Sequence, residues 1–440
     1  MAGALSARSW GRLPLAAAAT TVAADWRFQA LPGRDEVTTL LAHGARRSYG
    51  DSCINSGGTE LDTRQLDRFI ALDSNAGTLR CDAGVTLQEI LRLVVPRGWF
   101  LPVLPGTQFV TVGGAIANDI HGKNHHVSGS FGCHVDALTL LRSDGERRVC
   151  SESDNAGLFA ATIGGLGLTG LITEATLRLR PIACDRLVVE NLVFNSAQEF
   201  SQLSGESMDW EYTVSWVDVF ARAGRAGRGI FSRARHVDEP GELTAGGGRM
   251  RMSLPFAPPL PLVNSTTVDL FNRAYFLRGS RGLGVREQHF QPFFFPLDAI
   301  AHWNRLYGRQ GFYQYQCVIP RDGGVAILES LLRRIADSRE ASFLAVLKEF
   351  GERRSPGLLS FPRPGFTLAL DFPNRGAKTL TLFQSLDDIV MSAGGALYPA
   401  KDARMSAQTF ARSFPGSEVF SQYVDPRFCS NFWRRVRTGL

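Results

Sequence analysis

We predict an α+β protein of two domains, because the chain changes character at about Pro181. From Ala42 to Pro181, short β-like runs alternate with Gly-rich turns and one clear helix. Beyond Pro181, aromatic residues cluster in strand-like segments such as EYTVSWVDVF and GFYQYQCVIP, and helical segments separate them. With 440 residues, 44% of them hydrophobic, the chain is long enough to build two cores.

The first part of the chain contains one helix and two strands with clear local signals. Thr86 and Glu89 form a capping box that opens the helical segment LQEILRLVV. The segments ALTLLRS (137–143) and GLITEATLRLRP (170–181) alternate as β-strands do, and Asp144-Gly145 predicts a turn after the first of them. This part is therefore a mixture of helix and sheet.

The second part combines aromatic-rich strands with helices such as GVAILESLLRRIAD, which indicates a separate domain. Within it, residues 236–265 are rich in Gly and Pro, and residues 252–263 form an apolar stretch. A long segment of this kind is typical of a lid, a binding loop or a disordered region. The sequence does not decide between these three possibilities.

The charge pattern favours an acidic substrate or an anionic surface over nucleic acid. Forty-eight Lys and Arg against 42 Asp and Glu give a formal charge of +6, and the basic residues are scattered except for short groups around Arg222–Arg235. No aromatic residues are interleaved with them as nucleic-acid binding would require. The seven cysteines are widely spaced without a C-x-x-C pair, which predicts neither a disulfide framework nor a zinc site.

The chain has no apolar run of roughly 18 residues, so we expect no transmembrane helix. The alanine-rich N-terminal stretch is short, and Trp10-Gly11-Arg12 interrupts the approach to it, so we do not expect a signal peptide. Together these features predict a cytoplasmic rather than a periplasmic protein.

Three Gly-rich segments could bind phosphate through exposed backbone N–H groups. The segment Gly165–Gly170 satisfies G-x-G-x-x-G, but a helix-like segment precedes it and a strand follows, which is the reverse of the Rossmann order. The segments 43–51 and 105–115 contain Gly44, Gly50, Gly106, Gly113 and Gly114, and a strand–helix unit separates them. Taken together, they suggest a pyrophosphate cradle, although each alone is typical of a turn.

The stretch DIHGKNHH (119–126) holds three of the eight histidines of the chain. Histidines this close suggest a metal site, but no nearby acidic or Cys ligand has the right spacing and Lys123 would repel the ion. In a second interpretation, these histidines only form hydrogen bonds with the neighbouring backbone. Since Gly122 and Gly129 permit close approach of the backbone to a ligand, a loop facing a cofactor is favoured and no metal is expected.

The motifs RSYGD, LPVLPGT, IHGKNHH, GSFG and GG-LY-AKD-R, in this order, resemble those of flavoproteins of the vanillyl-alcohol-oxidase type. Within that family the similarity is to enzymes that oxidise the C2′ hydroxyl of a polyprenyl-phosphoryl-β-D-ribose, and it runs from about residue 44 to 404. The resemblance implies a PCMH-type FAD-binding domain over residues 1–182 and a substrate-binding domain over 183–395, built on an antiparallel sheet with flanking helices. A C-terminal segment, 396–440, would return to the first domain.

The resemblance also implies the site residues. Lys401 and His121 would be catalytic. The implied contacts with FAD are Gly44, Ala45, Arg46, Arg47, Ser48, Tyr49, Gly50, Asp51, Gly106, Thr111, Val112, Gly113, Gly114, Asn118, Asp119, Ile120, His121, Ile172 and Tyr398. The implied substrate contacts are Lys123, Trp216, Gln314, Gln316, Lys348 and Lys401. Because Arg47 stands where several relatives attach FAD through a His, FAD is expected to bind non-covalently; Arg46 stands where relatives often have Gly.

The implied reaction is the first half of an epimerisation to an arabinose donor for cell-wall polysaccharide. The flavin would accept the hydride, and Lys401 would act either as a neutral base or as a charged stabiliser, which the sequence does not decide. A separate NAD(P)H-dependent reductase and peripheral contact with the inner face of the membrane, through residues 252–263, are the implied partners. The alternatives are a soluble sugar-alcohol or aldonolactone oxidase, and a flavin-free polyprenyl-phosphate-binding protein.

Overall fold

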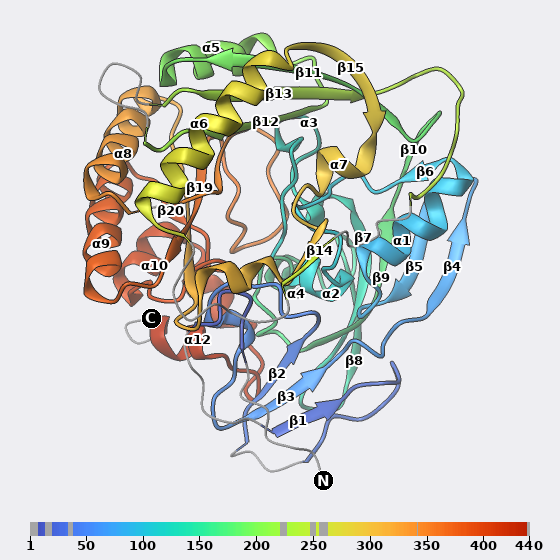
Figure 1. Ribbon diagram of the computed structural model, residues 1–440. Coiled ribbons are helices and arrows are strands. Elements are labelled where there is room, and N and C mark those ends of the chain that lie inside the picture. The colour runs from blue at the N-terminus through green and yellow to red at the C-terminus, as the bar shows by residue number, and fades with distance from the viewer. Residues whose placement is uncertain are drawn as a thin grey trace.

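The computed structural model describes residues 8–13, 20–33, 38–220, 227–246, 252–254, 263–340 and 342–437. Two antiparallel sheets dominate it, one from each half of the chain, and a small parallel sheet lies near the N-terminus (Figure 1). This mixture of helices with antiparallel sheets confirms the predicted α+β class.

The first half of the chain forms the parallel sheet and a five-stranded antiparallel sheet. The parallel sheet has the order β1 (Thr20–Ala23), β3 (Thr59–Asp62), β2 (Leu40–His43). The five-stranded sheet has the order β4 (Phe69–Asp73), β5 (Thr78–Asp82), β9 (Leu171–Arg178), β7 (Val135–Leu141), β8 (Arg147–Ser151). The helices of this half are α1 (Leu87–Val94), α2 (Val112–Ala117), α3 (His125–Ser128) and α4 (Ala156–Thr162), and β6 (Trp99–Phe100) pairs with β10 (Arg180–Pro181).

The local predictions for this half are confirmed. Thr86 caps α1: its Oγ1 accepts from the backbone N–H of Glu89 at 3.3 Å, and a Glu89 carboxylate oxygen accepts from the Thr86 N–H at 2.8 Å. The predicted strands 137–143 and 170–181 are β7 and β9, which pair antiparallel. Gly145 has φ of +87°, as the predicted turn requires.

The segment Gly165–Gly170 follows α4 and precedes β9, so the order of elements is the reverse of a dinucleotide-binding motif. Gly170 has φ of +139°, and a Cβ there would lie 2.8 Å from the carbonyl oxygen of Leu141. The glycines therefore make a tight turn against the neighbouring strand β7.

The second half of the chain forms an eight-stranded antiparallel sheet. Its order is β15 (Gly284–His289), β11 (Arg186–Phe194), β13 (Gly229–His236), β12 (Tyr212–Val217), β18 (Ala345–Phe350), β19 (Gly365–Pro373), β17 (Phe312–Ile319), β20 (Ala396–Leu397). The helices α5 (Ala197–Glu206), α8 (Gly324–Ser338) and α9 (Ala377–Ser392) pack on one another and cover one face, where they bury an apolar core (Figure 1). The predicted helix GVAILESLLRRIAD is α8.

Side chains alternate across this sheet, and the alternation decides which residues face the helices. On β17, Tyr315 and Cys317 are buried in the core with α8 and α9, whereas Gln314 and Gln316 lie on the opposite face. The face with Gln314 and Gln316, which also carries apolar side chains such as Val214 and Val346, is turned toward the first half of the chain. The remaining elements of this half are α6 (Ser265–Arg281), α7 (Phe290–Phe294), β14 (Met252–Ser253) and β16 (Ile300–Ala301).

The C-terminal segment packs against the N-terminal half. Its helices are α10 (Ala407–Ser413), α11 (Ser417–Ser421) and α12 (Asn431–Val436); α12 contacts residues 51–53, and Arg435 pairs with Asp51 at 2.6 Å. Residues 396–397 still pair with β17, so the return begins at Tyr398, whose hydroxyl donates to the Asn118 carbonyl at 2.8 Å. The division at 182 and 395 stays a prediction, which the composition of the sheets supports.

No helix among the described residues combines the length and apolar character that crossing a membrane would require. Most of the apolar stretch 252–263 lies outside the described residues, so its prediction as a lid or loop is not assessed by the structure. Residues 252–253 form β14, which pairs in parallel with β16.

Candidate active site

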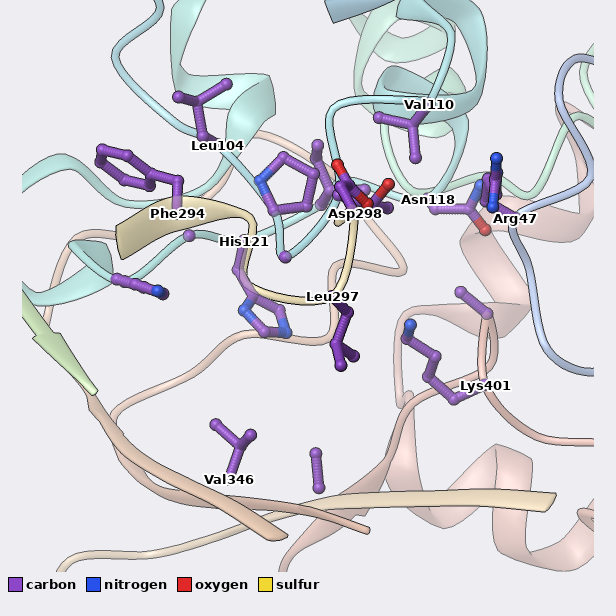
Figure 2. Close-up of a pocket in the computed structure, with 18 of the residues that line it drawn as sticks. Arg47, Leu104, Val110, Asn118, His121, Phe294, Leu297, Asp298, Val346 and Lys401 are labelled. Carbon is purple, nitrogen blue, oxygen red and sulfur yellow. The ribbon is translucent and has the colours of Figure 1, made fainter. Parts of the chain in front are cut away.

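A cavity of about 940 Å³ lies between the two halves of the chain. Its walls come from segments 43–49, 104–123 and 166–172 on one side, and from segment 288–303 and the face of the eight-stranded sheet that bears Gln314 and Gln316 on the other. The volume is at the upper end of the roughly 300–1,000 Å³ typical of ligand pockets. In Figure 2, His121 and Lys401 project into this space from different segments of the chain, with Leu297 between them in this view.

One end of the cavity offers free backbone donors. Among the described residues, none accepts a hydrogen bond from the backbone N–H groups of residues 44–48. Arg46 within this run has φ of +49°, and a left-handed residue in such a run turns successive N–H groups toward one concave site that binds anions. Such a site fits a pyrophosphate group.

Two arginines complete this end. Arg46 pairs with the buried carboxylate of Glu60, which holds its unfavourable backbone conformation in place. The guanidinium of Arg47 stacks on the Trp10 ring at 4.1 Å, and its buried Nε has no hydrogen-bond partner in the described part of the chain. An unsatisfied buried donor of this kind is expected where an anionic ligand binds.

The segment 111–114 contributes differently from what its glycines predicted. The N–H groups of Val112 and Gly113 donate to Val85 and Ala83 at 2.9 and 2.7 Å, and the Gly114 N–H donates to Thr111 Oγ1 at 3.3 Å. They are therefore not available to a phosphate. The glycines of both segments serve close packing instead, since a Cβ on Gly44 would lie 2.1 Å from Thr111 Oγ1.

Four of the implied FAD contacts, Gly50, Asp51, Val112 and Asp119, are not among the residues that line the cavity. Asp119 is turned into the protein, where it accepts from the Gly132 N–H at 2.8 Å and from Ser360 Oγ at 2.5 Å. Asp51 pairs with Arg435, and Gly50 lies so close to the backbone of residue 402 that a Cβ would clash with it. Their contacts within the protein hold the loops of the cavity wall in place.

The other implied residues do line the cavity. On the first half of the chain they are Gly44, Ala45, Arg46, Arg47, Ser48, Tyr49, Gly106, Thr111, Gly113, Gly114, Asn118, Ile120, His121, Lys123 and Ile172, and on the second half Trp216, Gln314, Gln316, Lys348, Tyr398 and Lys401. Residues separated by up to about 350 positions in the chain thus meet around one space.

His121 lies at the centre of a polar cluster. Its Nε2 is 3.0 Å from the amide nitrogen of Gln316, and its Nδ1 is 3.1 Å from Lys348 Nζ. Burial, followed by repulsion from Lys348, lowers the pKa of His121 well below its usual range, so the imidazole is neutral. The two ring nitrogens are thus held by Gln316 and Lys348, and Lys348 Nζ also donates to the Gly122 carbonyl at 3.0 Å.

Three lysines converge on the same space, and burial lowers the pKa of each. The pKa falls to about 7 for Lys123, where repulsion from Lys348 adds to burial, and to about 7 for Lys348, where repulsion from Lys401 adds to burial. For Lys401 it falls to about 8, because burial outweighs the attraction of Asp371. Lys401 Nζ also lies 4.0 Å from the centre of the Tyr49 ring. At neutral pH these amines can therefore exchange protons, as catalytic lysines must.

The sequence interpretation missed the acidic partner of this cluster. Asp371 is fully buried on β19; its Oδ1 accepts from the Gln314 amide at 2.5 Å, and its Oδ2 has no partner among the described residues. Burial raises the pKa of Asp371 to about 7. The signal in the sequence was a lone acid inside the apolar strand GFTLALDFP.

Three arginines of the cavity wall were also missed. Arg278, Arg281 and Arg286 line it from α6 and β15, and none of them forms an ion pair with a described residue. Arg278 and Arg281 stand at i, i+3 in the segment FLRGSR, a spacing that places both on neighbouring positions of one helix.

The other histidines of DIHGKNHH do not reach the cavity. His126 bonds the Trp210 carbonyl oxygen at 2.8 Å through Nε2, and His125 is buried with its ring 4.6 Å from that of Phe350. Within the described residues, no three His, Cys, Asp or Glu side chains are grouped so that they could hold a metal ion.

Comparison with known proteins agrees with this geometry. Residues 34–151 match a family model described as FAD binding domain. The chain is 37% identical over 414 residues to the decaprenylphosphoryl-beta-D-ribose oxidase of Mycolicibacterium smegmatis, covering 90% of this chain and 89% of that protein. It is 35% identical over 369 residues to an uncharacterised Streptomyces coelicolor protein, covering 80% and 100%. The mouse L-gulonolactone oxidase is 34% identical over 119 residues, or 27% of this chain and 26% of that protein.

Proposed function

This chain belongs to the decaprenylphosphoryl-β-D-ribose oxidase family of FAD-dependent oxidoreductases, and we propose that it oxidises the C2′ hydroxyl of a polyprenyl-phosphoryl-β-D-ribose to the 2′-keto sugar. The observation that carries the proposal is the group of ionisable amines in the cavity, where Lys401 and Lys348 stand beside His121. Oxidation of a secondary alcohol needs a group that removes the hydroxyl proton, and this cluster supplies one.

FAD is the cofactor of the chain, and the structure has the residues to hold it. The free N–H groups of residues 44–48 and the unsatisfied Arg47 Nε form an anion site for its pyrophosphate. When bound, FAD supplies the hydride acceptor. We propose that it binds non-covalently, because Arg47 offers no nucleophilic atom where some relatives carry a His.

Lys401 is proposed as the base. In its neutral form it can take the proton of the substrate hydroxyl, and the attraction of Asp371 favours the ammonium that results. The Tyr49 ring, 4.0 Å away, stabilises the same cation. Lys401 is therefore neutral often enough to accept a proton and has partners that hold it once charged.

The other cavity side chains are proposed to orient the sugar. Gln316 and Lys348 fix the ring of His121, so its position does not depend on the substrate. Gln314 lines the cavity and is held by Asp371 and Tyr49, so its position does not depend on the substrate either. Lys123 faces the same space and can attract the phosphate of the substrate.

Isotopic substitution of the substrate tests this proposal. Under anaerobic single-turnover conditions, loss of flavin absorbance should be slower with deuterium at C2′ of the ribose than with protium. Deuterium at C3′ is the matched control and should leave the rate unchanged. A slower rate with C3′ deuterium alone would refute oxidation at C2′.

The alternative of an aldonolactone oxidase has weaker support, because the similarity to L-gulonolactone oxidase covers only 27% of the chain. The full-length similarity is to the ribose oxidase. We further propose that a separate NAD(P)H-dependent reductase consumes the keto sugar, since an epimerisation needs a reduction after this oxidation, and that the protein contacts a membrane to reach its lipid-linked substrate.

A further inference from the structure

Helix α6 presents apolar side chains to solvent beside the cavity. Leu270, Ala274 and Leu277 stand at i, i+4 and i+7 on one stripe, which continues to Arg281. The exposed fraction is 70% for Leu270 and 55% for Leu277, and Leu283 in the turn after the helix is 52% exposed. A surface helix normally turns such a stripe toward the core, so an outward stripe marks a contact surface.

The orientation of α6 is fixed from its inner side. Asn272 is buried and donates to Asp218 Oδ1 at 2.9 Å. Gly279 lies so close to Ile230 of β13 that a Cβ would be 2.3 Å from its side chain. α6 runs in front of β13 toward β15 (Figure 1). The outward stripe is therefore a consequence of specific packing on the inner face.

An aromatic path joins the stripe to the cavity. Trp216 on β12 lines the cavity, and its ring centre is 4.7 Å from that of Tyr275 on α6, which lines it too. Tyr275 stacks on Phe271 at 5.7 Å, and Phe271 is 41% exposed next to Leu270. Apolar surface thus continues from the cavity wall to the outer face of the helix.

The part of the cavity wall formed by α6 and β15 is exposed and carries positive charge. Arg278, Arg281 and Arg286 are exposed, line the cavity, and form no ion pair with the described residues. By contrast, Arg273 on the same helix pairs with Asp269 at 2.8 Å. Apolar side chains flanked by uncompensated arginines on a surface helix match the chemistry of an anionic bilayer, where the chains insert and the cations bind phosphate.

We infer that α6 and the turn at Leu283 dock on the surface of an anionic lipid bilayer, so that the cavity mouth opens toward the lipid. The path from Phe271 through Tyr275 to Trp216 then receives the prenyl chain, and the arginines contact the phosphate groups of the surrounding lipids. This inference rests on the proposed function for the lipid-linked substrate, and it moves the membrane contact from residues 252–263 to α6.

Vesicle flotation of the purified, flavin-loaded protein tests the inference. We expect the protein to float with phosphatidylcholine vesicles that contain phosphatidylglycerol, and much less with pure phosphatidylcholine. The double variant Leu270→Glu, Leu277→Glu should lose at least about tenfold in vesicle affinity, since two largely exposed leucines no longer insert. The matched control is Leu380→Glu, an exposed apolar residue of α9 (40%), which should float as the unchanged protein does.

Two further measurements keep the result interpretable. Flavin absorbance and thermal unfolding check that the variants fold. Oxidation of a short-chain, water-soluble prenyl-phosphoryl ribose should be unchanged in the double variant, whose leucines do not line the cavity. If the protein without substitutions does not oxidise this short-chain substrate, the proposed function is refuted. That result would not bear on the docking surface, which the flotation experiment tests.

The inference is overturned if the unchanged protein does not float with anionic vesicles, or if the double variant floats equally well. It is also overturned if the double variant instead converts a dimer to a monomer in size-exclusion chromatography, because the face would then join two copies of the chain.

Discussion

The charge state of Lys401 gives the most specific prediction about the chemistry. Burial lowers its pKa to about 8, and Asp371 is the group that raises it. If Lys401 acts as a neutral base, the rate of anaerobic flavin reduction should rise with pH and level off above this pKa. With a single ionisation near 8, the rate should increase roughly tenfold between about pH 7 and 9.

Replacing Asp371 by Asn should move this profile to lower pH. The variant keeps a group that can bond to the Gln314 amide but removes the charge that favours the ammonium of Lys401. If the pKa of Lys401 falls by about one unit, the rate at pH 7, expressed as a fraction of the plateau rate, should rise roughly fivefold. The other charged or polar neighbours of Lys401 are Lys348, His121 and Tyr49, and they are unchanged.

Lys401→Arg separates the two possible roles of this residue. Arginine keeps the positive charge but does not deprotonate in a protein, so it can stabilise an alkoxide but cannot act as a base. We expect it to bind FAD and to reduce it very slowly at every pH. Three results would refute the reasoning. The rate of flavin reduction in the unchanged protein could be independent of pH, Lys401→Arg could reduce its flavin as fast as the unchanged protein, or Asp371→Asn could move the pH profile to higher pH.

The other predictions concern stability of the cofactor-free protein, measured by urea unfolding. Thr86→Ala removes the cap of α1 and should lower the free energy of unfolding by about 1 kcal/mol. Gly44→Ala should lower the free energy of unfolding by about 1–3 kcal/mol, because its Cβ would clash with Thr111. Gly106→Ala is the control and should be nearly neutral, because a Cβ there meets open space. Equal effects of the two substitutions would argue against the packing role of Gly44. Lys123→Met should stabilise by about 2 kcal/mol at pH 7, a figure discounted because the side chain borders the cavity and because Met loses the hydrogen bond that Lys123 Nζ donates to the Phe293 carbonyl. Since the pKa of Lys123 is lowered in the folded state to about 7, the unchanged protein gains stability as pH rises from 7 toward 10.5, and the advantage of Met should shrink over that range.

Features with a local cause could be predicted from the sequence. The cap at Thr86 depends on residues within one turn, and the alternation along β17 places Gln314 and Gln316 on one face whatever the sheet packs against. Motif resemblance then supplied the identity of Lys401 and Lys123 as cavity residues, which lie 278 positions apart in the chain.

Features that depend on distant partners could not be predicted in the same way. Asp119 stands in the most specific motif of the chain, but Ser360 draws its carboxylate away from the cavity. Asp371 comes beside Gln314 only through the register of β17 with β19. The N–H groups of Val112 and Gly113 are occupied by residues 83–85, which no pattern within 105–115 reveals.

The central claim is that this chain reduces its FAD with a lipid-linked ribose, and the visible spectrum of the purified protein tests it most directly. Anaerobic addition of one equivalent of polyprenyl-phosphoryl-β-D-ribose should bleach the visible flavin band, whereas an aldonolactone or a free sugar alcohol should leave it unchanged. Bleaching by the lactone or the alcohol, with none by the prenyl-phosphoryl ribose, would contradict the account.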